Sequence, residues 1–190
     1  TYRGKLDHLR TPELVRPHDT LVLDQTTRSN LNLLDGTGGE RRGSLLHVID
    51  RTATPMGSRT LRRWMLAPLT SPAAIGRRLD AVERLVEGVD LRADVRAGLT
   101  GMGDLERLVG RVGTGGVSPR DLMRLTAALT RIGTLHDRLT EQDGLLGEIA
   151  ATLDSLPALH ERITATLVEE PPAALRAGPV IRDGAHGEVD

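Results

Sequence analysis

Residues 118–139, SPRDLMRLTAALTRIGTLHDRL, decide the fold class of this chain. Leucine or isoleucine returns every three or four residues along much of this stretch, which places these side chains on one side of an α-helix. Ser118 can cap the free backbone N–H groups at the helix start, and Pro119 suits the first helical position because its φ is already set. The sequence therefore predicts an amphipathic helix of more than about five turns, which needs other helices to cover its apolar side.

The same start signal occurs at Thr54-Pro55 and at Ser71-Pro72. A proline-directed kinase could recognise such pairs, but each pair stands directly before an apolar pattern of helical spacing, which favours capping. Asp24, Ser44, Asp104 and Pro157 begin other patterns of the same kind, so we predict an all-α, multi-helix bundle. The apolar positions that we expect to face inward from these further helices are Leu31 and Leu34; Leu45, Val48 and Ile49; Ile75, Leu79, Val82 and Val86; Leu91, Val95 and Leu99; Leu105, Leu108, Val109 and Val112; Leu145, Ile149, Leu153 and Leu156; and Leu159, Ile163 and Leu167.

The helical pattern covers most of the chain, and its limits divide the chain into three parts. We expect a lead-in over residues 1–19, a helical core domain over 20–172 and a turn-rich tail over 173–190. Extended structure is expected at most as short pieces near residues 20–23 and 180–181, where a few β-branched and leucine residues adjoin turn signals. The chain is long enough for one domain with a short appendage.

Composition excludes several classes of function. The 190 residues contain no cysteine, so disulfides and cysteine-bound metals are excluded, and this composition is compatible with the cytoplasm. The formal net charge is −1, which produces no global attraction to nucleic acid or to a membrane surface. No apolar run is long enough to cross a bilayer.

The motifs of common enzymes and cofactor sites are also missing. Lys5 is the only lysine and Leu6 follows it, so the chain cannot contain a phosphate-binding P-loop. The two GTGG segments, 36–39 and 113–116, are interpreted as plain loops because neither follows a credible strand. The six histidines are scattered, with no pair at metal-ligand spacing on one helix. We therefore expect no catalytic, cofactor-binding or metal-binding residue in this chain.

Residues 52–69, TATPMGSRTLRRWMLAPL, hold the only tryptophan and a cluster of arginines. We expect Trp64 to be buried beside Leu61 and Met65, because aromatic side chains contribute much of the apolar area in a core. The arginines of this helix, and those at 41–42 and 77–78, could contact phosphate. Acidic residues balance them and no aromatic residues interleave to stack bases, so ion pairs or contacts with a neighbouring domain are favoured over direct contact with DNA.

Several segments in order resemble the core, or lever, domain III of the MutS family of DNA mismatch-repair proteins. The element LD-x-x-T-x-x-N-L matches Leu23 to Leu31, although Ser29 and Asn32 depart from the usual residues there. The G-x-V-I-x-x-G…E-x-D run at 178–190 matches the segment before the family's clamp. The most specific matching residues, which we take as family-signature structural positions, are Thr54, Pro55, Met56, Gly57, Ser58, Arg59, Trp64, Asp104, Leu105, Glu106, Arg107, Ser118, Pro119, Arg120 and Asp121.

The resemblance implies a role for this chain that its composition alone does not indicate. In the family, the core links a C-terminal ATPase to a DNA clamp and is not itself catalytic. The parent protein would bind mismatched double-stranded DNA, ATP and Mg²⁺ through parts outside this chain, would include connector, clamp and ATPase domains, and would act as a cytoplasmic homodimer. This chain would end before the clamp. Two alternatives remain open: a free-standing helical module that binds a protein partner, and the core of a MutS relative devoted to recombination.

Overall fold

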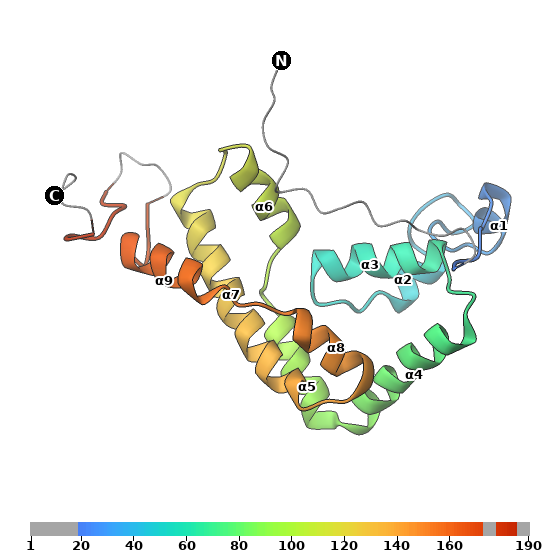
Figure 1. Ribbon diagram of the computed structural model, residues 1–190. Helices are drawn as coiled ribbons and strands as arrows, with labels where there is room; N and C mark the ends of the chain where they lie inside the picture. Colours follow the sequence, from blue (N-terminus) through green and yellow to red (C-terminus); the bar gives the residue numbers. More distant parts are fainter. Residues whose placement is uncertain (1–18, 173–177, 186–190) are drawn as a thin grey trace, which may run out of the picture.

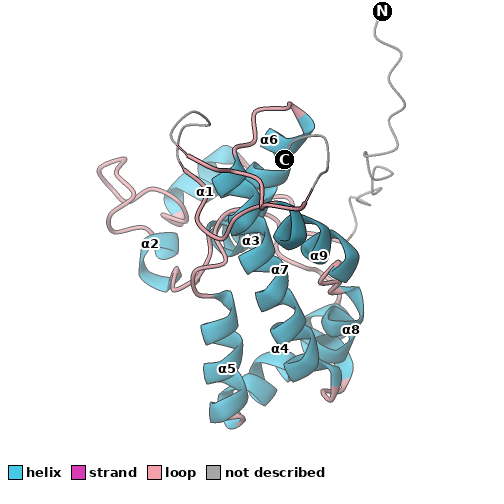
Figure 2. Ribbon diagram, turned by 90° about the vertical axis from the view of Figure 1, so that its left-hand side faces the viewer, coloured by secondary structure: helices cyan, strands magenta, loops and turns pink. Residues whose placement is uncertain are grey.

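A computed structural model describes residues 19–172 and 178–185 of the chain. Within these ranges the protein contains nine α-helices and no β-sheet, so the predicted all-α class is confirmed (Figures 1 and 2). Most of the expected lead-in (1–19) and much of the expected tail (173–190) lie outside the described residues. The helices are α1 (Gln25–Asn30), α2 (Leu45–Ile49), α3 (Pro55–Leu66), α4 (Pro72–Glu87), α5 (Val89–Leu99), α6 (Leu105–Gly113), α7 (Pro119–Thr140), α8 (Gly144–Thr152) and α9 (Pro157–Thr166).

Helix α7 is the centre of the fold. It is 22 residues long, as the long amphipathic pattern predicted, and it packs against α5, α6, α8 and α9 (Figure 1). Leu129, Leu135 and Leu139 on its inner side are buried. Helix α4 is at the edge of this group, where it packs on α5 and α8.

The predicted start signals are capped helix ends. The Thr54 hydroxyl accepts a hydrogen bond from the Gly57 N–H at 3.0 Å. At the start of α7, Ser118 Oγ accepts from the Asp121 N–H at 3.2 Å, and the Asp121 carboxylate accepts from the Ser118 N–H at 3.2 Å. This reciprocal pair is a capping box, which satisfies two backbone donors that a helix start otherwise leaves free. The capping interpretation of the Thr-Pro and Ser-Pro pairs is thus confirmed.

The two short extended pieces are reduced to single bridges. Thr20 pairs with Leu69, and Leu167 pairs with Ile181, each as an isolated antiparallel bridge. The first bridge joins the segment before α1 to the segment after α3, and the second joins the end of α9 to residues near 181.

A glycine allows a close approach of two helices in the core. A Cβ atom built at Gly98 of α5 would lie 2.7 Å from Cδ2 and 2.9 Å from Cγ of Leu135 in α7. Leu135 is in turn packed with Met102 and Ala128 in a buried cluster. The absence of a side chain at Gly98 therefore lets α5 approach α7 at this level.

The expected burial of Trp64 is wrong. Its side chain is 44% exposed, and the guanidinium carbon of Arg78 lies 3.8 Å from the centre of its ring. Helix α3 reaches the core cluster through Met56, at its opposite end. The tryptophan therefore forms a cation–π contact at the surface instead of filling the core.

Several expected inward-facing stripes are wrong in the same way. On α8 the buried residues are Leu146 and Ala150, one position along from the predicted Leu145 and Ile149. On α4 the residues that pack against the core are Ala81 and Leu85. In each helix the neighbours, and not the apolar pattern alone, select the face that is covered. The predicted core positions that are exposed in this structure are Leu31, Leu45, Val48, Ile49, Ile75, Leu79, Val82, Val86, Val109, Val112, Ile149, Leu156 and Leu159.

Candidate functional site

The signature residues at the start of α3 and at the start of α6 meet at one ion-pair junction. Arg59 Nη1 and Nη2 donate to the two carboxylate oxygens of Asp104 at 2.7 and 2.8 Å, across 45 residues of sequence. The same guanidinium also binds Glu106, with Nε at 3.0 Å from Oε2. We call Arg59, Asp104 and Glu106 the Arg59 junction. It holds α3 to α6, two helices that are far apart in the sequence.

Asp104 serves two purposes at this junction. Its side chain also accepts from the Arg107 N–H at 3.3 Å, which makes it the N-cap of α6. Its carboxylate is only 15% exposed, and the hydrogen bonds from Arg59 hold its pKa at about 2, below the ordinary 3.8. The carboxylates in turn raise the pKa of Arg59, so the pair stays charged across the physiological range.

A second junction connects α2 to α3 through Asp50. Its carboxylate accepts from Ser58 Oγ at 2.6 Å, from Thr52 Oγ1 at 2.7 Å and from Arg41 at 3.1 Å. The hydrogen bond from Ser58, followed by that from Thr52, lowers the pKa of Asp50. Sequence reasoning did not select Asp50 as a site residue. The Asp-x-Thr spacing after a helix, which is typical of an Asx-turn, was the available signal.

A third junction centres on Asp121 at the start of α7. Asp121 is 4% exposed and is paired with Arg111 of α6 at 3.0 Å and with Arg124 at 3.3 Å. The backbone N–H of Ser118 lowers its pKa most, followed by the Ser118 hydroxyl. The neighbouring signature residue Arg120 donates from Nε to the Pro171 carbonyl at 2.8 Å, which ties α7 to the segment after α9.

Among the signature positions, Arg59, Asp104, Glu106 and Asp121 make contacts between helices in this structure. Thr54 and Ser118 instead cap the starts of their own helices. The segment around 54–59 and the segment around 104–107 are brought together, and the segment 118–121 adds its contact through α6. Trp64 is not part of any of these junctions. The expectation that the arginines form ion pairs is confirmed for Arg59, Arg41 and Arg77.

Replacing Arg59 by Gln is expected to change how stability depends on pH. Because the pKa of Asp104 is lowered to about 2 in the folded chain from 3.8, its stabilising contribution is present above about pH 4 and is lost as the pH falls from about 4 to about 2. In R59Q the pKa of Asp104 rises toward its ordinary value, so the variant loses less stability over that interval than the unaltered chain. Thermal unfolding followed by circular dichroism at intervals from pH 6 to pH 2 measures the difference.

Arg63→Gln is the matched control, because Arg63 lies on the same helix and carries the same charge outside the junction. Its pH dependence should follow that of the unaltered chain. Parallel curves for R59Q and R63Q below pH 4 would show that the Arg59 junction does not form in solution.

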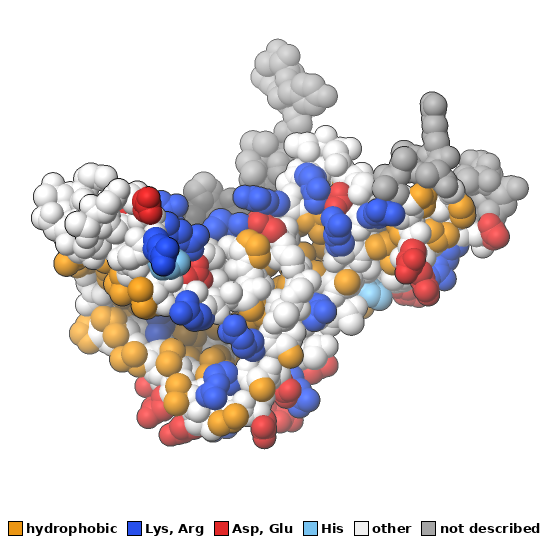
Figure 3. All heavy atoms as spheres, turned by 180° about the vertical axis from the view of Figure 1, so that it is seen from behind, with side chains coloured by type: hydrophobic (Ala, Val, Ile, Leu, Met, Phe, Trp, Pro, Cys, Tyr) orange, Lys and Arg blue, Asp and Glu red, His pale blue; other side chains and the backbone are white. Residues whose placement is uncertain are grey.

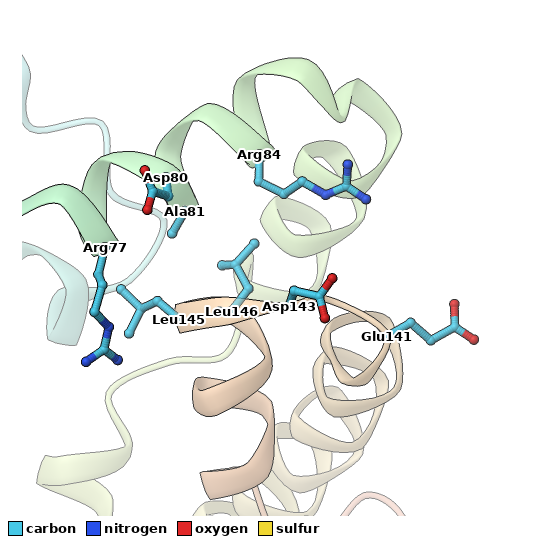
Figure 4. Close-up of a pocket in the computed structure, with 9 residues that line it drawn as sticks. Arg77, Asp80, Ala81, Arg84, Glu141, Asp143, Leu145 and Leu146 are labelled. Carbon is cyan, nitrogen blue, oxygen red and sulfur yellow. The ribbon is translucent and has the colours of Figure 1, made fainter.

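A hollow lies between α4 and the connection from α7 to α8, and side chains on its two sides bond to each other. It has a volume of about 420 Å³, and Figure 4 shows the charged side chains that line it on both sides. Arg77 pairs with Glu148, and Arg84 Nε donates to Gln142 Oε1 at 3.1 Å, so both arginines already have partners from the facing segment.

Across the described part of the chain, no three His, Asp or Glu side chains are grouped to hold a metal ion. No described helix is long and apolar enough to span a membrane.

The fold and the three junctions define a helical domain in which the most specific sequence motifs hold helices together. A model of the MutS domain III family matches residues 26–186. The DNA mismatch repair protein MutS of Salinibacter ruber is 40% identical over 192 residues, which cover 100% of this chain and 21% of that protein. The protein of the same name from Synechococcus sp. is 43% identical over 189 residues, covering 98% of this chain and 21% of that protein. The protein of the same name from Methanothrix thermoacetophila is 39% identical over 195 residues, which cover 97% of this chain and 22% of that protein.

This chain belongs to the MutS domain III family. It spans about a fifth of the length of the curated relatives that it matches. The resemblance of its motifs to the MutS core is thereby confirmed.

Proposed function

We propose that this chain is the mechanical core of a DNA mismatch-recognition protein, which couples an ATPase to a DNA clamp and performs no chemistry itself. The Arg59 junction is the observation that carries the proposal. It joins α3 to α6 through charged side chains at the surface, whereas α7 is joined to its neighbours through a buried apolar side. A close-packed group of helices moves as one body, and a junction of ion pairs can change partners or geometry when that body rotates.

The stiffness of the α7 group supports a lever. Leu139 of α7 packs with Leu146 and Ala150 of α8, and α4 adds Leu85 to the same cluster. Because these side chains are close-packed, a displacement at one end of α7 is transmitted to the other end and is not absorbed along the way.

Exposed apolar surface supports contacts with other domains of the parent. Leu79, Val82 and Val86 form an exposed row on α4, and hydrophobic side chains gather on this side of the molecule in Figure 3. A groove of about 670 Å³ lies between the segment before α3 and helices α4 and α5, and Leu85 and Val89 are among the residues that line it. Contiguous exposed apolar surface is typical of an interaction site. The connector, clamp and ATPase domains are the partners that we propose for it.

The remaining parts of the proposal concern the parent. Mismatched double-stranded DNA, ATP and Mg²⁺ would bind outside this chain, in the four fifths of the length that the chain does not span, and the parent would act as a homodimer. These statements follow from the family resemblance.

The Arg59→Gln substitution in the full-length parent tests the proposal. If the Arg59 junction carries the movement, ATP-induced release from mismatched DNA should slow by roughly fivefold or more, which is the lower end of typical allosteric couplings. The basal ATPase rate and the affinity for mismatched duplex without ATP should stay within about twofold, because R59Q alters neither binding site. Stopped-flow fluorescence anisotropy with a labelled mismatched duplex measures the release.

Arg63→Gln in the same parent is the control and should release DNA at the unaltered rate. Unchanged release by R59Q would contradict a role of this junction in coupling. A parent that lacks ATP-induced release altogether, or that stops after this domain, would favour a free-standing module or a recombination-type relative.

A further inference from the structure

Residues 19–70 are closed on themselves by their own hydrogen bonds. The start of this segment pairs with its end, where the Leu21 N–H donates to the Pro68 carbonyl at 2.7 Å. Helix α2 is fixed to the segment after α1, because the Leu46 N–H donates to the Leu33 carbonyl at 3.0 Å and both of these leucines are buried. Together with the junction that joins α2 to α3, these contacts hold residues 19–70 together as one unit, which we call the α1–α3 unit.

Helices α4 to α9, which we call the helical body, pack separately from this unit. Among the described residues, every extensive helix-to-helix contact is made between two helices of the body. The two buried clusters of the body include Leu135 and Leu139 of α7, and Met56 is the one residue of the α1–α3 unit, in the described part of the chain, that packs against either cluster. Figure 1 shows α1, α2 and α3 together at one side, with α4 leading away from them. The close packing that makes the body rigid therefore extends little into the α1–α3 unit.

Polar contacts at the surface cross the border between the unit and the body. The Arg59 junction binds α3 to α6, and the Arg59 side chain is 42% exposed. Elsewhere on the border, Arg96 Nη1 of the body donates to the Arg51 carbonyl of the unit at 3.1 Å. Exposed ion pairs stabilise weakly and are screened by salt. The border can therefore open without the loss of a close-packed interface.

The apolar groove of about 670 Å³ lies along the same border. Ala53 of the unit lines one side of it, and Leu85 and Val95 of the body line the other. Apolar side chains of the two parts thus face a common hollow and do not fill it, so the unit and the body are not close-packed there.

The covalent connection between the two parts is short. Leu69 still lies in the unit, because it pairs with Thr20 in an antiparallel bridge, and Pro72 already begins α4. Ser71, directly before Pro72, caps α4 and ends the connection. A few residues at the end of an element can absorb the changes in φ and ψ that a rotation needs.

We infer that the α1–α3 unit hinges at Ser71 against the helical body, and that the Arg59 junction is the latch that holds the arrangement seen here. When the latch is intact, the chain keeps one arrangement of its two parts. When the latch is broken, the unit rotates and the body keeps its packing. This hinge is a property of the chain itself and goes beyond the coupling role, because it identifies the part of the chain that moves.

Distances between spin labels, measured by double electron–electron resonance in the 190-residue chain, test the hinge. The chain has no cysteine, so labels attach only to the introduced residues His47→Cys on α2 and Ala127→Cys on α7, both at exposed positions. With Arg59 present we expect a single narrow distribution of distances. The R59Q substitution should broaden it, and so should sodium chloride at about 1 M with Arg59 present, because salt screens exposed ion pairs at this concentration.

Two controls separate rotation from general loosening. Labels at Asp90 of α5 and Ala127 of α7 report on the body alone, and their distribution should stay narrow in R59Q. Arg63→Gln, which removes a charge from α3 outside the junction, should leave the distribution between His47 and Ala127 unchanged. Circular dichroism verifies that each labelled variant is folded.

Distributions between His47 and Ala127 that superimpose with and without R59Q would overturn the inference. Equal broadening by R63Q, or equal broadening of the pair within the body, would also overturn it. The release of DNA by the parent does not enter this measurement, so the hinge can fail while the coupling role stands, and the coupling role can fail while the hinge stands.

Discussion

Replacing Leu135 by Ala is expected to lower the free energy of unfolding by about 2–5 kcal/mol. Leu135 is 5% exposed and packs with Met102 and Ala128 where α5 crosses α7. Removal of its branched end discards buried apolar area and leaves a cavity that the surrounding helices fill only in part. Urea denaturation of the 190-residue chain, followed by circular dichroism, measures the change.

The matched control is Leu79→Ala on α4. Leu79 is 61% exposed, so the same chemical change removes little buried area, and the expected loss is within about 0.5 kcal/mol. A loss in L135A no larger than that in L79A would show that the buried cluster around Leu135 does not form in solution.

Replacing Gly98 by Ala is expected to destabilise the chain by about 1–3 kcal/mol, the usual cost of overpacking. The added methyl group would lie 2.7 Å from Cδ2 of Leu135, so the side chain or the helix must shift. On an open helix face the same change stabilises by roughly 0.5–1 kcal/mol, because alanine loses less backbone entropy than glycine. A loss of stability in G98A therefore indicates that α5 closely approaches α7, whereas a gain would indicate an open helix face.

Gly76→Ala on α4 is the control for this sign. A Cβ atom at Gly76 meets no other atom within 4 Å, so G76A should be neutral or stabilising in the same denaturation experiment. Stabilisation in G98A comparable to that in G76A would contradict the close approach of α5 to α7 at Gly98.

The double variant G98A/L135A distinguishes the clash between the new methyl group and Leu135 from the effect of replacing glycine by alanine within a helix. In the L135A background the side chain that meets the new methyl group has been removed, so adding G98A should be neutral or stabilising. The two substitutions are thus expected to be strongly non-additive, as is usual for residues in contact. Additive losses would show that the two positions act on different parts of the structure.

The local features of the fold were predictable from sequence. Ser118 and Asp121 are three residues apart, so the hydrogen bonds of their capping box depend only on the backbone between them. Thr54 satisfies the Gly57 N–H in the same local manner. Helix starts were therefore correctly placed, and the length of α7 followed from its apolar period.

The candidate site was predictable only in its parts. Arg59 and Asp104 were both selected from the family motifs, but 45 residues separate them and no spacing rule predicts that they meet. Asp50 was not selected at all, because the hydrogen bond that it accepts from Ser58 depends on how α2 lies against α3.

The sequence by itself determined the helices, their caps and the family, because each depends on residues within a few positions or on motifs in fixed order. Only the tertiary structure decided which side of each helix is covered. Val82 and Leu85 of α4 are both apolar, yet Leu85 packs on α8 while Val82 is exposed, since burial depends on the neighbour and not on the side chain alone. Trp64 shows the same dependence: it is apolar and lies in the helical pattern of α3, yet it is 44% exposed and its ring contacts Arg78 at the surface.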